Sequence, residues 1–200
     1  MDNLFNNRKF YEVANSISAS LDTKIKALTK FDFEKSSVEQ ISENLFEKYK
    51  IVIPKLLEEE IHMKSPEDVK IRTEGRGGYY RTASTTVDGT KFTFVIPFEG
   101  DGSTFKILPS TYLSTLPYGE INSNEIRIIF KVPIGRDSSN LKVEFDKNLD
   151  KIKVYLGYLE NDIKPFNNNL SAAISASVQG RKNKLDKDDE AANSFGLPIR

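Results

Sequence analysis

Glu99, Gly100 and Asp101 come nearest to a binding site among the residue types of this sequence, within the stretch "VIPFEGDGSTFKILPS" (residues 95–110). The two carboxylates are two residues apart and could contact one cation, but a Ca²⁺ or Mg²⁺ site needs more oxygen ligands than this stretch supplies. The glycines and hydroxyls also lack the spacing and the lysine of a P-loop. We therefore expect a turn between two strands, with these three residues as a recognition loop and no bound metal.

Catalytic arrangements are equally hard to build from the rest of the chain. His62 is the single histidine and no G-x-S-x-G motif is present, so a Ser-His-Asp triad finds no support and a site with two histidines is excluded. A Mg²⁺-dependent phosphodiesterase would require Glu99 and Asp101 to converge with a lysine such as Lys91 or Lys106. The sequence favours a chain with no catalytic residue and no cofactor, and the phosphodiesterase is the less favoured alternative.

A basic and aromatic segment between Lys70 and Lys91 is a second candidate site. Five basic and two acidic residues lie there together with two tyrosines, a mixture that contacts phosphates and stacks on bases when it lies on an exposed sheet face. A polar sheet face with cross-strand ion pairs explains the same residues and is favoured. A basic pair near residue 181 would also complement a helix dipole. The candidate nucleic-acid contacts are Arg72, Arg76, Tyr79, Tyr80, Arg81, Arg181 and Lys182.

The composition limits the classes of partner and compartment. The 29 basic and 29 acidic residues of the 200-residue chain cancel, so no overall field favours nucleic acid or an anionic membrane. The absence of cysteine removes disulfides and thiolate chemistry, which fits a reducing, cytoplasmic setting. The first ten residues lack the pattern of a signal peptide, and no run reaches the roughly 18 apolar residues of a membrane span. We expect a cytoplasmic protein that is neither secreted nor inserted in a membrane.

Hydrophobic periodicity predicts helices at the N-terminal end of the chain. Apolar residues recur at steps of three and four over residues 8–29, which indicates an amphipathic helix. A second helix is predicted from Ser36, which has capping-box spacing to Glu39, until Pro54 prevents continuation. Residues 54–62 could add a short third helical segment.

From residue 68 the pattern changes to the alternation typical of strands. Strands are predicted near residues 68–74, 79–87, 90–98, 103–108 and 124–134. Asp88 and Gly89 form a dipeptide that suits a two-residue type I′ hairpin, because both positions of that turn need positive φ. We therefore expect an antiparallel meander of about five strands, with helices covering its apolar face.

The C-terminal third carries a heptad pattern of apolar residues. Pro165 interrupts this helix on the side away from the pattern, so a kink or a break into two helices is expected. The seam could pack within one chain or join two chains, and packing within the chain is favoured. As an oligomer seam, it would consist of Phe145, Leu149, Ile152, Leu156, Leu159, Ile163, Phe166 and Leu170.

These elements predict an α+β fold with an N-terminal helical pair, a meander of about five strands and a long C-terminal helix or kinked helix pair. A single domain would span residues 1–185, with helices in 8–60, the sheet in 68–134 and helices in 138–185. Residues 186–200 would form a tail or linker. The expected partner is a second copy, another domain or another protein, bound through the C-terminal helices.

The segments "FEKYKIVIPKL", "VIPFEGDGSTFKILPSTYLSTLPYGEI", "DIKPFNNNLSAAISASVQGRKNKL" and "FGLPIR" together resemble the N-terminal region of certain bacterial nuclease proteins. In those proteins, often linked to defence against phage, the region precedes a nuclease domain of the PD-(D/E)XK type. The matching motifs are "PFEGD" at 97–101, "LPST" at 108–111, and Phe166, Asn167, Arg181 and Lys182. These motifs are not catalytic, so no catalytic residue is transferred.

The resemblance implies a non-catalytic interaction, sensor or assembly domain of a bacterial defence-type nuclease, whose nuclease carboxylates would lie beyond Arg200. A nucleic-acid-binding domain that uses the basic and tyrosine-rich sheet face is the main alternative.

Overall fold

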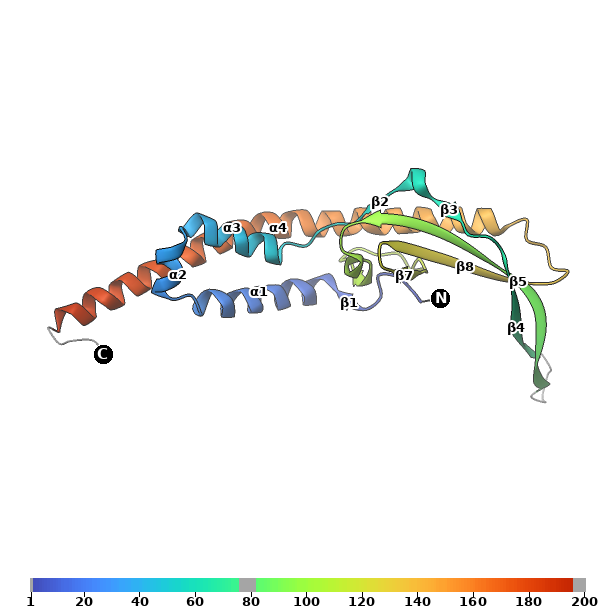
Figure 1. Ribbon diagram of the computed structural model, residues 1–200, viewed down its shortest axis with the longest axis horizontal. Coiled ribbons are helices and arrows are strands. Elements are labelled where there is room, and N and C mark those ends of the chain that lie inside the picture. Colours follow the sequence, from blue (N-terminus) through green and yellow to red (C-terminus); the bar gives the residue numbers. More distant parts are fainter. Residues whose placement is uncertain (1, 76–81, 196–200) are drawn as a thin grey trace. The chain divides into compact units, whose positions relative to one another are not determined.

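The computed structural model describes residues 2–75 and 82–195. It has the predicted α+β class, with N-terminal helices, an antiparallel sheet and a long C-terminal helix (Figure 1). The chain forms two compact units that alternate along the sequence. The sheet unit comprises Met1–Arg8 and Val52–Tyr158, and the helical unit comprises Lys9–Ile51 and Leu159–Arg200. That both units belong to one cooperatively unfolding domain stays a prediction.

The helical unit packs three N-terminal helices with the later part of a C-terminal helix. These are α1 (Phe10–Lys26), α2 (Lys30–Lys35), α3 (Val38–Tyr49) and α4 (Leu141–Ser194). The periodicity that predicts α1 and α3 also gives their buried side, because its apolar residues meet those of α4. The buried cluster consists of Leu21, Ile25, Leu28, Ile41, Leu45, Leu170, Ile174 and Val178.

Two capping boxes set the starts of the short helices. Ser37 caps α3, its Oγ accepting from Gln40 N–H at 3.2 Å while the Gln40 side chain accepts from Ser37 N–H at 3.0 Å. The predicted box of Ser36 and Glu39 is therefore wrong by one residue. A similar box starts α2, where the Asp32 carboxylate accepts from Thr29 N–H at 2.7 Å. Helix α2 has too few residues to show an apolar period and is not predicted from the sequence.

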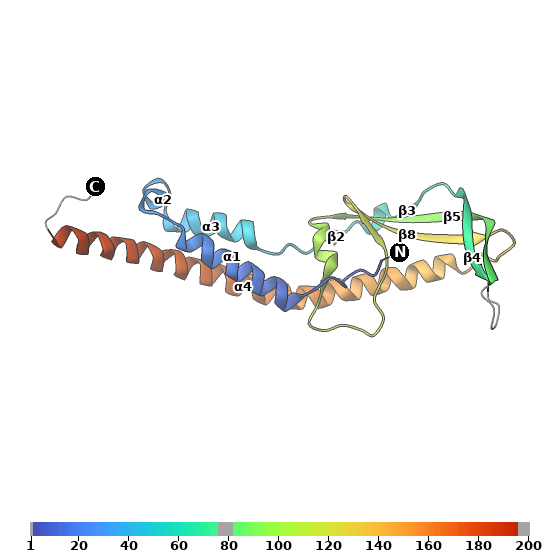
Figure 2. The same cartoon turned by 90° about the horizontal axis from the view of Figure 1, so that it is seen from below.

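The main sheet is antiparallel, and most of its strands pair with one long strand (Figure 2). That strand is β5 (Thr82–Glu99), and it pairs with β2, β3, β4 and β8. The other strands are β2 (Lys55–Leu56), β3 (His62–Met63), β4 (Glu67–Gly75), β7 (Glu120–Asn122) and β8 (Glu125–Pro133). A separate two-stranded sheet pairs β1 (Arg8–Lys9) with β6 (Ile107–Leu108), and short 3-10 helices occupy Glu58–Glu60 and Gly102–Lys106.

The predicted hairpin at Asp88 and Gly89 is wrong, because β5 runs through both residues without turning. Gly89 is needed there for a different reason. A Cβ atom on it would clash with the Ile71 side chain and lie 2.6 Å from the Val132 carbonyl oxygen. The glycine therefore permits close approach of neighbouring strands rather than a turn.

The other strand predictions have mixed outcomes. Strands β4 and β8 confirm those near 68–74 and 124–134. Residues 79–81, the start of the strand predicted near 79–87, lie outside the described part of the chain. The strand near 103–108 is wrong, since a 3-10 helix fills Gly102–Lys106 and the two residues of β6 pair with β1. The connection after β5 is therefore not the hairpin that the sequence suggests.

One face of the sheet packs on the first part of α4 (Figures 1 and 2). Phe94 of β5 stacks on Phe145 of α4 with ring centroids 4.6 Å apart, and it meets Phe130 of β8 edge to face at 5.7 Å. Farther along α4, Tyr155 stacks on Phe5 at 5.2 Å. These contacts are part of the core of the sheet unit, and burial of such aromatic surfaces stabilises it.

Helix α4 is a single helix that contains Pro165, so the predicted break into two helices does not occur. It also continues to Ser194, so residues 186–194 are helical, and their role as a tail or linker stays a prediction. Most of the predicted oligomer seam is buried within the chain, including Phe145, Ile152 and Ile163, while Leu156 and Phe166 are half-buried. The favoured intramolecular packing accounts for the heptad pattern. Over the described residues, no helix has the length and apolar content to cross a membrane.

Candidate recognition surface on the sheet

The side of the sheet opposite α4, here called the outer face, carries most of its charged residues. Side chains of a strand alternate between the two faces, and Phe94 and Phe130 point toward α4. Odd-numbered residues of β5 and β8, such as Lys91 and Lys131, therefore belong to the outer face. Glu120 of β7 joins them, because it is directly opposite Arg127 of β8 in the ladder.

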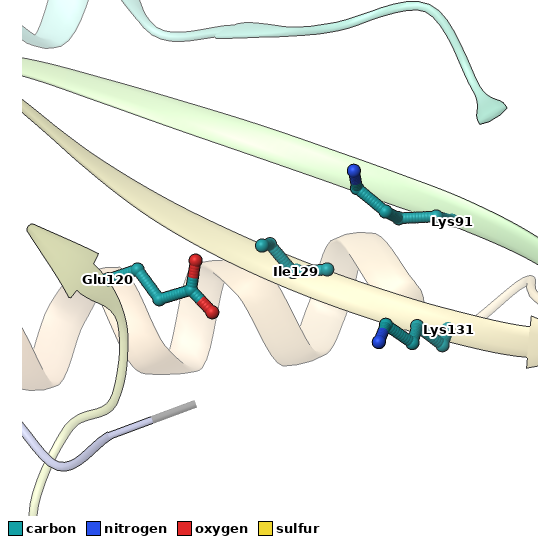
Figure 3. Close-up of a pocket in the computed structure, with 4 residues that line it drawn as sticks. All are labelled: Lys91, Glu120, Ile129 and Lys131. Carbon is teal, nitrogen blue, oxygen red and sulfur yellow. The ribbon is translucent and has the colours of Figure 1, made fainter. Parts of the chain in front are cut away.

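A hollow of about 390 Å³ lies on the outer face and is lined by Lys91, Glu120, Ile129 and Lys131 (Figure 3). The side chains of Glu120 and Lys131 extend toward one another from β7 and β8, with Ile129 between them. Three strands thus supply one carboxylate, two ammonium groups and an apolar floor. The volume is in the range of small-molecule pockets, which is roughly 300–1,000 Å³.

Two lysines are directly opposite one another in the β5–β8 ladder at this hollow, since Lys91 is the register partner of Lys131. Like charges in that position repel. Lys91 is compensated from its other side, where Glu67 of β4 accepts a hydrogen bond from its ammonium at 2.8 Å. This hydrogen bond and the charge of Lys91 lower the pKa of Glu67. Lys131 makes no ion pair with any residue that the structure describes.

Glu120 makes no ion pair with a described residue either, although Arg127 is opposite it in the ladder. Arg127 turns instead to Glu125, two residues earlier on the same strand, and Lys64 approaches Glu125 at 3.5 Å. Burial disfavours the charged form of Glu125, but its hydrogen bond with Arg127 and both cations keep its pKa lowered. Both nearby cations are therefore engaged by Glu125. Within residues 2–75 and 82–195, the Glu120 carboxylate has no ion-pair partner.

The arrangement suits binding. An ammonium without an ion-pair partner attracts an anionic group, and a carboxylate without one accepts from an N–H or O–H donor. An apolar side chain between them can contact a less polar part of a ligand. A ligand that satisfies all three carries an anionic group and a hydrogen-bond donor on opposite sides of a less polar centre.

The predicted recognition loop has a structural role in this fold. Glu99 is the last residue of β5 and pairs with Lys55, and Gly100 adopts a φ of +104° next to Pro54. The Asp101 carboxylate accepts from Ser103 N–H at 2.8 Å and from Ser103 Oγ–H at 2.6 Å, which caps the following 3-10 helix. Asp101 therefore stabilises the start of this 3-10 helix, while a recognition role of the loop stays a prediction.

Of the two lysines in the phosphodiesterase alternative, Lys91 lies far from Glu99. Lys91 and Glu99 are eight residues apart on the same extended strand, a separation of about 26 Å. Among the described residues, no group of three or more His, Asp or Glu side chains could hold a metal ion. His62 is exposed on β3, with Nδ1 2.9 Å from the Glu60 carbonyl oxygen.

The predicted nucleic-acid contacts fall into three groups. Arg76, Tyr79, Tyr80 and Arg81 lie outside the residues that the structure describes. Arg72 is exposed on β4, opposite Thr86 of β5. Arg181 and Lys182 belong to the helical unit, where Arg181 Nε–H donates to the Leu28 carbonyl at 3.0 Å and Lys182 pairs with Asp186 at 3.3 Å. Arg181 thus ties α4 to the end of α1.

Sequence reasoning includes Lys91 among its candidates but misses Glu120, Ile129 and Lys131. The alternation in "EIRIIFKVP" places Ile129 and Lys131 on one face of β8, which is the available signal. Glu120 and Lys91 reach the same place only because β7 and β5 pair with β8 on its two sides.

No family model, curated protein or solved structure matches this chain.

Proposed function

We propose that the chain is a non-catalytic recognition domain, a sensor whose sheet binds a small anionic ligand in the hollow of the outer face. The observation that carries this proposal is Lys131, which is opposite Lys91 on the ladder and makes no ion pair within the described part of the chain. An anion bound there would remove the repulsion between the two lysines. Binding would therefore relieve an unfavourable interaction of the free protein.

Glu120 and Ile129 narrow the class of ligand. The carboxylate of Glu120 would repel a simple multivalent anion, so the ligand must also present a donor toward β7. Ile129 would contact the part of the ligand between its two polar ends. A nucleoside monophosphate or an amino acid has an anionic group and a separate hydrogen-bond donor, whereas inorganic phosphate carries its charge and its O–H on one small group.

The resemblance to defence-type nucleases adds a biological setting to this proposal. In that setting the ligand would be the trigger, and a nuclease domain beyond Arg200 would be the output. Sequencing the natural reading frame past Arg200 tests this part separately, because a frame without a nuclease domain removes the setting and leaves the binding site standing.

The binding test uses amide chemical shifts of the ¹⁵N-labelled chain during titration with AMP, glutamate and inorganic phosphate. We expect shifts at residues 91, 120, 129 and 131 with AMP or glutamate, and weaker ones with phosphate. Lys131→Gln should weaken binding by about tenfold, since it removes a charge-assisted contact. Lys147→Gln, which removes an exposed lysine of α4 in the same unit, should leave binding unchanged.

The proposal is wrong if none of the three probes perturbs these amides at millimolar concentration, or if Lys131→Gln and Lys147→Gln bind alike. Anisotropy of a labelled single-stranded DNA tests the alternative in parallel. Binding that falls steeply with salt and is weakened by Arg72→Gln rather than Lys131→Gln would favour the nucleic-acid-binding domain instead.

A further inference from the structure

Among the residues that the structure describes, strand β4 has a partner on one side only. Within the described chain it pairs with β5 from Glu67 to Gly75, and both ribbon views place it at the end of the sheet (Figures 1 and 2). An open strand edge presents unpaired N–H and C=O groups that can pair with another strand. The ligand hollow described above is lined by residues of β5, β7 and β8, so the edge of β4 is a different surface.

The hydrogen bonds of β5 determine which residues of β4 face the open edge. Phe98 N–H donates to the Asn124 carbonyl and Ile134 N–H to the Asp88 carbonyl, both at the β8 side of β5. Because the register between these points is continuous, even-numbered residues of β5 bond to β8 and odd-numbered ones bond to β4. Their β4 partners are Glu67, Val69 and Ile71. The backbone groups of Asp68, Lys70 and Arg72 therefore point outward.

The outward edge has a charge order that is complementary to itself. Among its residues acidic Asp68 comes first and basic Lys70 and Arg72 follow, before Glu74 near the end of the strand. An edge with one sign of charge would repel a second copy of itself. In an antiparallel pair of two β4 strands, the acidic half of each copy meets the basic half of the other.

The register of such a pair follows from geometry. Outward-facing residues must be opposite one another to exchange hydrogen bonds, so only registers that pair even-numbered residues are allowed. Pairing centred on Lys70 opposes two lysines, and pairing centred on Asp68 opposes two aspartates. Pairing centred on Val69 sets Asp68 of each copy opposite Lys70 of the other. It is the register in which both central charge pairs attract.

We propose that two copies of this chain associate through antiparallel pairing of their β4 strands, centred on Val69. Within each copy the Lys70 ammonium already pairs with Asp88 of β5, and both side chains are largely exposed. In the dimer this ammonium lies between Asp88 of its own chain and Asp68 of the second copy. The exposed Ile134, which lines a hollow of about 280 Å³ with Asp68 and Lys70, adds apolar surface beside the pairing.

Cysteine crosslinking tests the register directly, because the chain contains no cysteine. The two Val69 residues would form a non-hydrogen-bonded pair with Cα atoms about 4.5 Å apart, within the disulfide range of roughly 4.4–6.8 Å. Val69→Cys should therefore give a covalent dimer under mild oxidation. The matched control is Arg72→Cys on the same edge. Its two copies would be about 20 Å apart and should stay uncrosslinked.

Proline substitution tests the use of the edge. Lys70 N–H points outward, so Lys70→Pro removes a donor to the second copy but no β4–β5 hydrogen bond. Lys70→Ala is the control, because it removes the side-chain charge and keeps the N–H group. In sedimentation equilibrium of the full chain we expect a dimer that weakens several-fold in the alanine variant and by about tenfold more in the proline variant. Circular dichroism checks that both variants fold.

A wild-type chain that stays monomeric up to about 200 µM overturns the proposal, since no second copy then occupies the edge. A dimer that Lys70→Pro leaves intact uses another surface and overturns it too. Equal crosslinking of Val69→Cys and Arg72→Cys would show random collision rather than the proposed register.

Discussion

The side-chain amide of Asn167 binds both backbone groups of Ile51. Its Oδ1 accepts from Ile51 N–H at 3.1 Å and its Nδ2 donates to the Ile51 carbonyl at 2.9 Å. Ile51 follows the end of α3, where the chain has left the helix and its backbone groups have no helical partner. Asn167 supplies the partner from α4, and so fixes how the chain leaves the helical unit.

The same kind of contact occurs twice in the sheet unit. Asn148 accepts from Tyr118 N–H at 3.0 Å and donates to the Tyr118 carbonyl at 2.7 Å. The Tyr155 hydroxyl accepts from Leu113 N–H at 3.1 Å and donates to the Leu113 carbonyl at 2.9 Å. Both side chains are buried on α4, so the irregular segment between β6 and β7 is held through its backbone.

Asn167→Ala should destabilise the protein by about 1–3 kcal/mol, because it leaves two part-buried backbone groups of Ile51 without partners. The free energy of unfolding in urea measures this loss. Asn168→Ala, at the exposed neighbouring position, should change it by less than about 0.5 kcal/mol. Equal effects of the two variants would mean that the amide contributes no specific stabilisation.

The urea unfolding curve of the wild-type chain also tests the predicted single domain, which requires one cooperative transition.

Tyr155→Phe should loosen the segment between β6 and β7 while the aromatic packing on Phe5 remains. Loss of the hydroxyl removes both bonds to Leu113, and we expect about 1–2 kcal/mol of destabilisation. Hydrogen exchange at the Leu113 amide should accelerate in this variant. The control is Tyr158→Phe, whose hydroxyl makes no hydrogen bond with a described residue. Unchanged exchange at Leu113 in Tyr155→Phe would contradict the prediction.

Two glycines should respond to alanine in opposite directions. Gly157 is inside α4 with nothing within 4 Å of an added Cβ, so Gly157→Ala should stabilise the protein by about 0.5–1 kcal/mol. In Gly89→Ala the Cβ would lie 2.6 Å from the Val132 carbonyl oxygen, and strand movement should cost about 1–3 kcal/mol. Thermal unfolding of both variants measures the difference. A neutral Gly89→Ala would show that β5 and β8 can separate there without loss.

The carboxyl of Asp32 should titrate below its ordinary pKa of 3.8, because hydrogen bonds from the backbone and side chain of Thr29 favour the charged form. Since the folded-state pKa is the lower one, the carboxylate stabilises the start of α2 above about pH 3.8, and this contribution disappears as the pH falls through the folded-state pKa. Carboxyl carbon shifts measure the titration. Thr29→Ala should raise the Asp32 pKa toward 3.8, and an unchanged value would mean that the hydroxyl bond is absent in solution.

Periodicity predicts those elements whose buried side is a simple repeat. The apolar residues of α1, α4 and β8 recur at regular intervals because each element packs one face on its neighbours, so the local sequence is sufficient to predict these elements. Gly89 shows where local sequence fails. Its dipeptide with Asp88 has strong turn chemistry, but the glycine is required by the distant residues Ile71 and Val132. A turn glycine and a close-contact glycine look alike until the strands are placed.

The candidate site is less predictable than the fold for the same reason. Each strand shows which of its residues share a face, but Lys91, Glu120 and Lys131 come from three strands. Their meeting depends on the register of β5 with β8 and of β8 with β7. The sequence also gives no indication that Glu67 pairs with Lys91 while Lys131 has no ion-pair partner in the described ranges, because that follows from the position of β4.

The three α4 side chains that hold Ile51, Leu113 and Tyr118 bind main-chain atoms, which nearly every residue type supplies. Ile51, Leu113 and Tyr118 can therefore be substituted without loss of the contacts, unless a proline removes the N–H group. Asn148, Tyr155 and Asn167 of α4 have no such freedom, because their side chains make the contacts. In diverged relatives we expect an Asn-x6-Tyr-x11-Asn spacing in the long helix to persist while the segments it anchors drift beyond recognition. A search for such relatives should therefore start from that spacing rather than from the anchored segments.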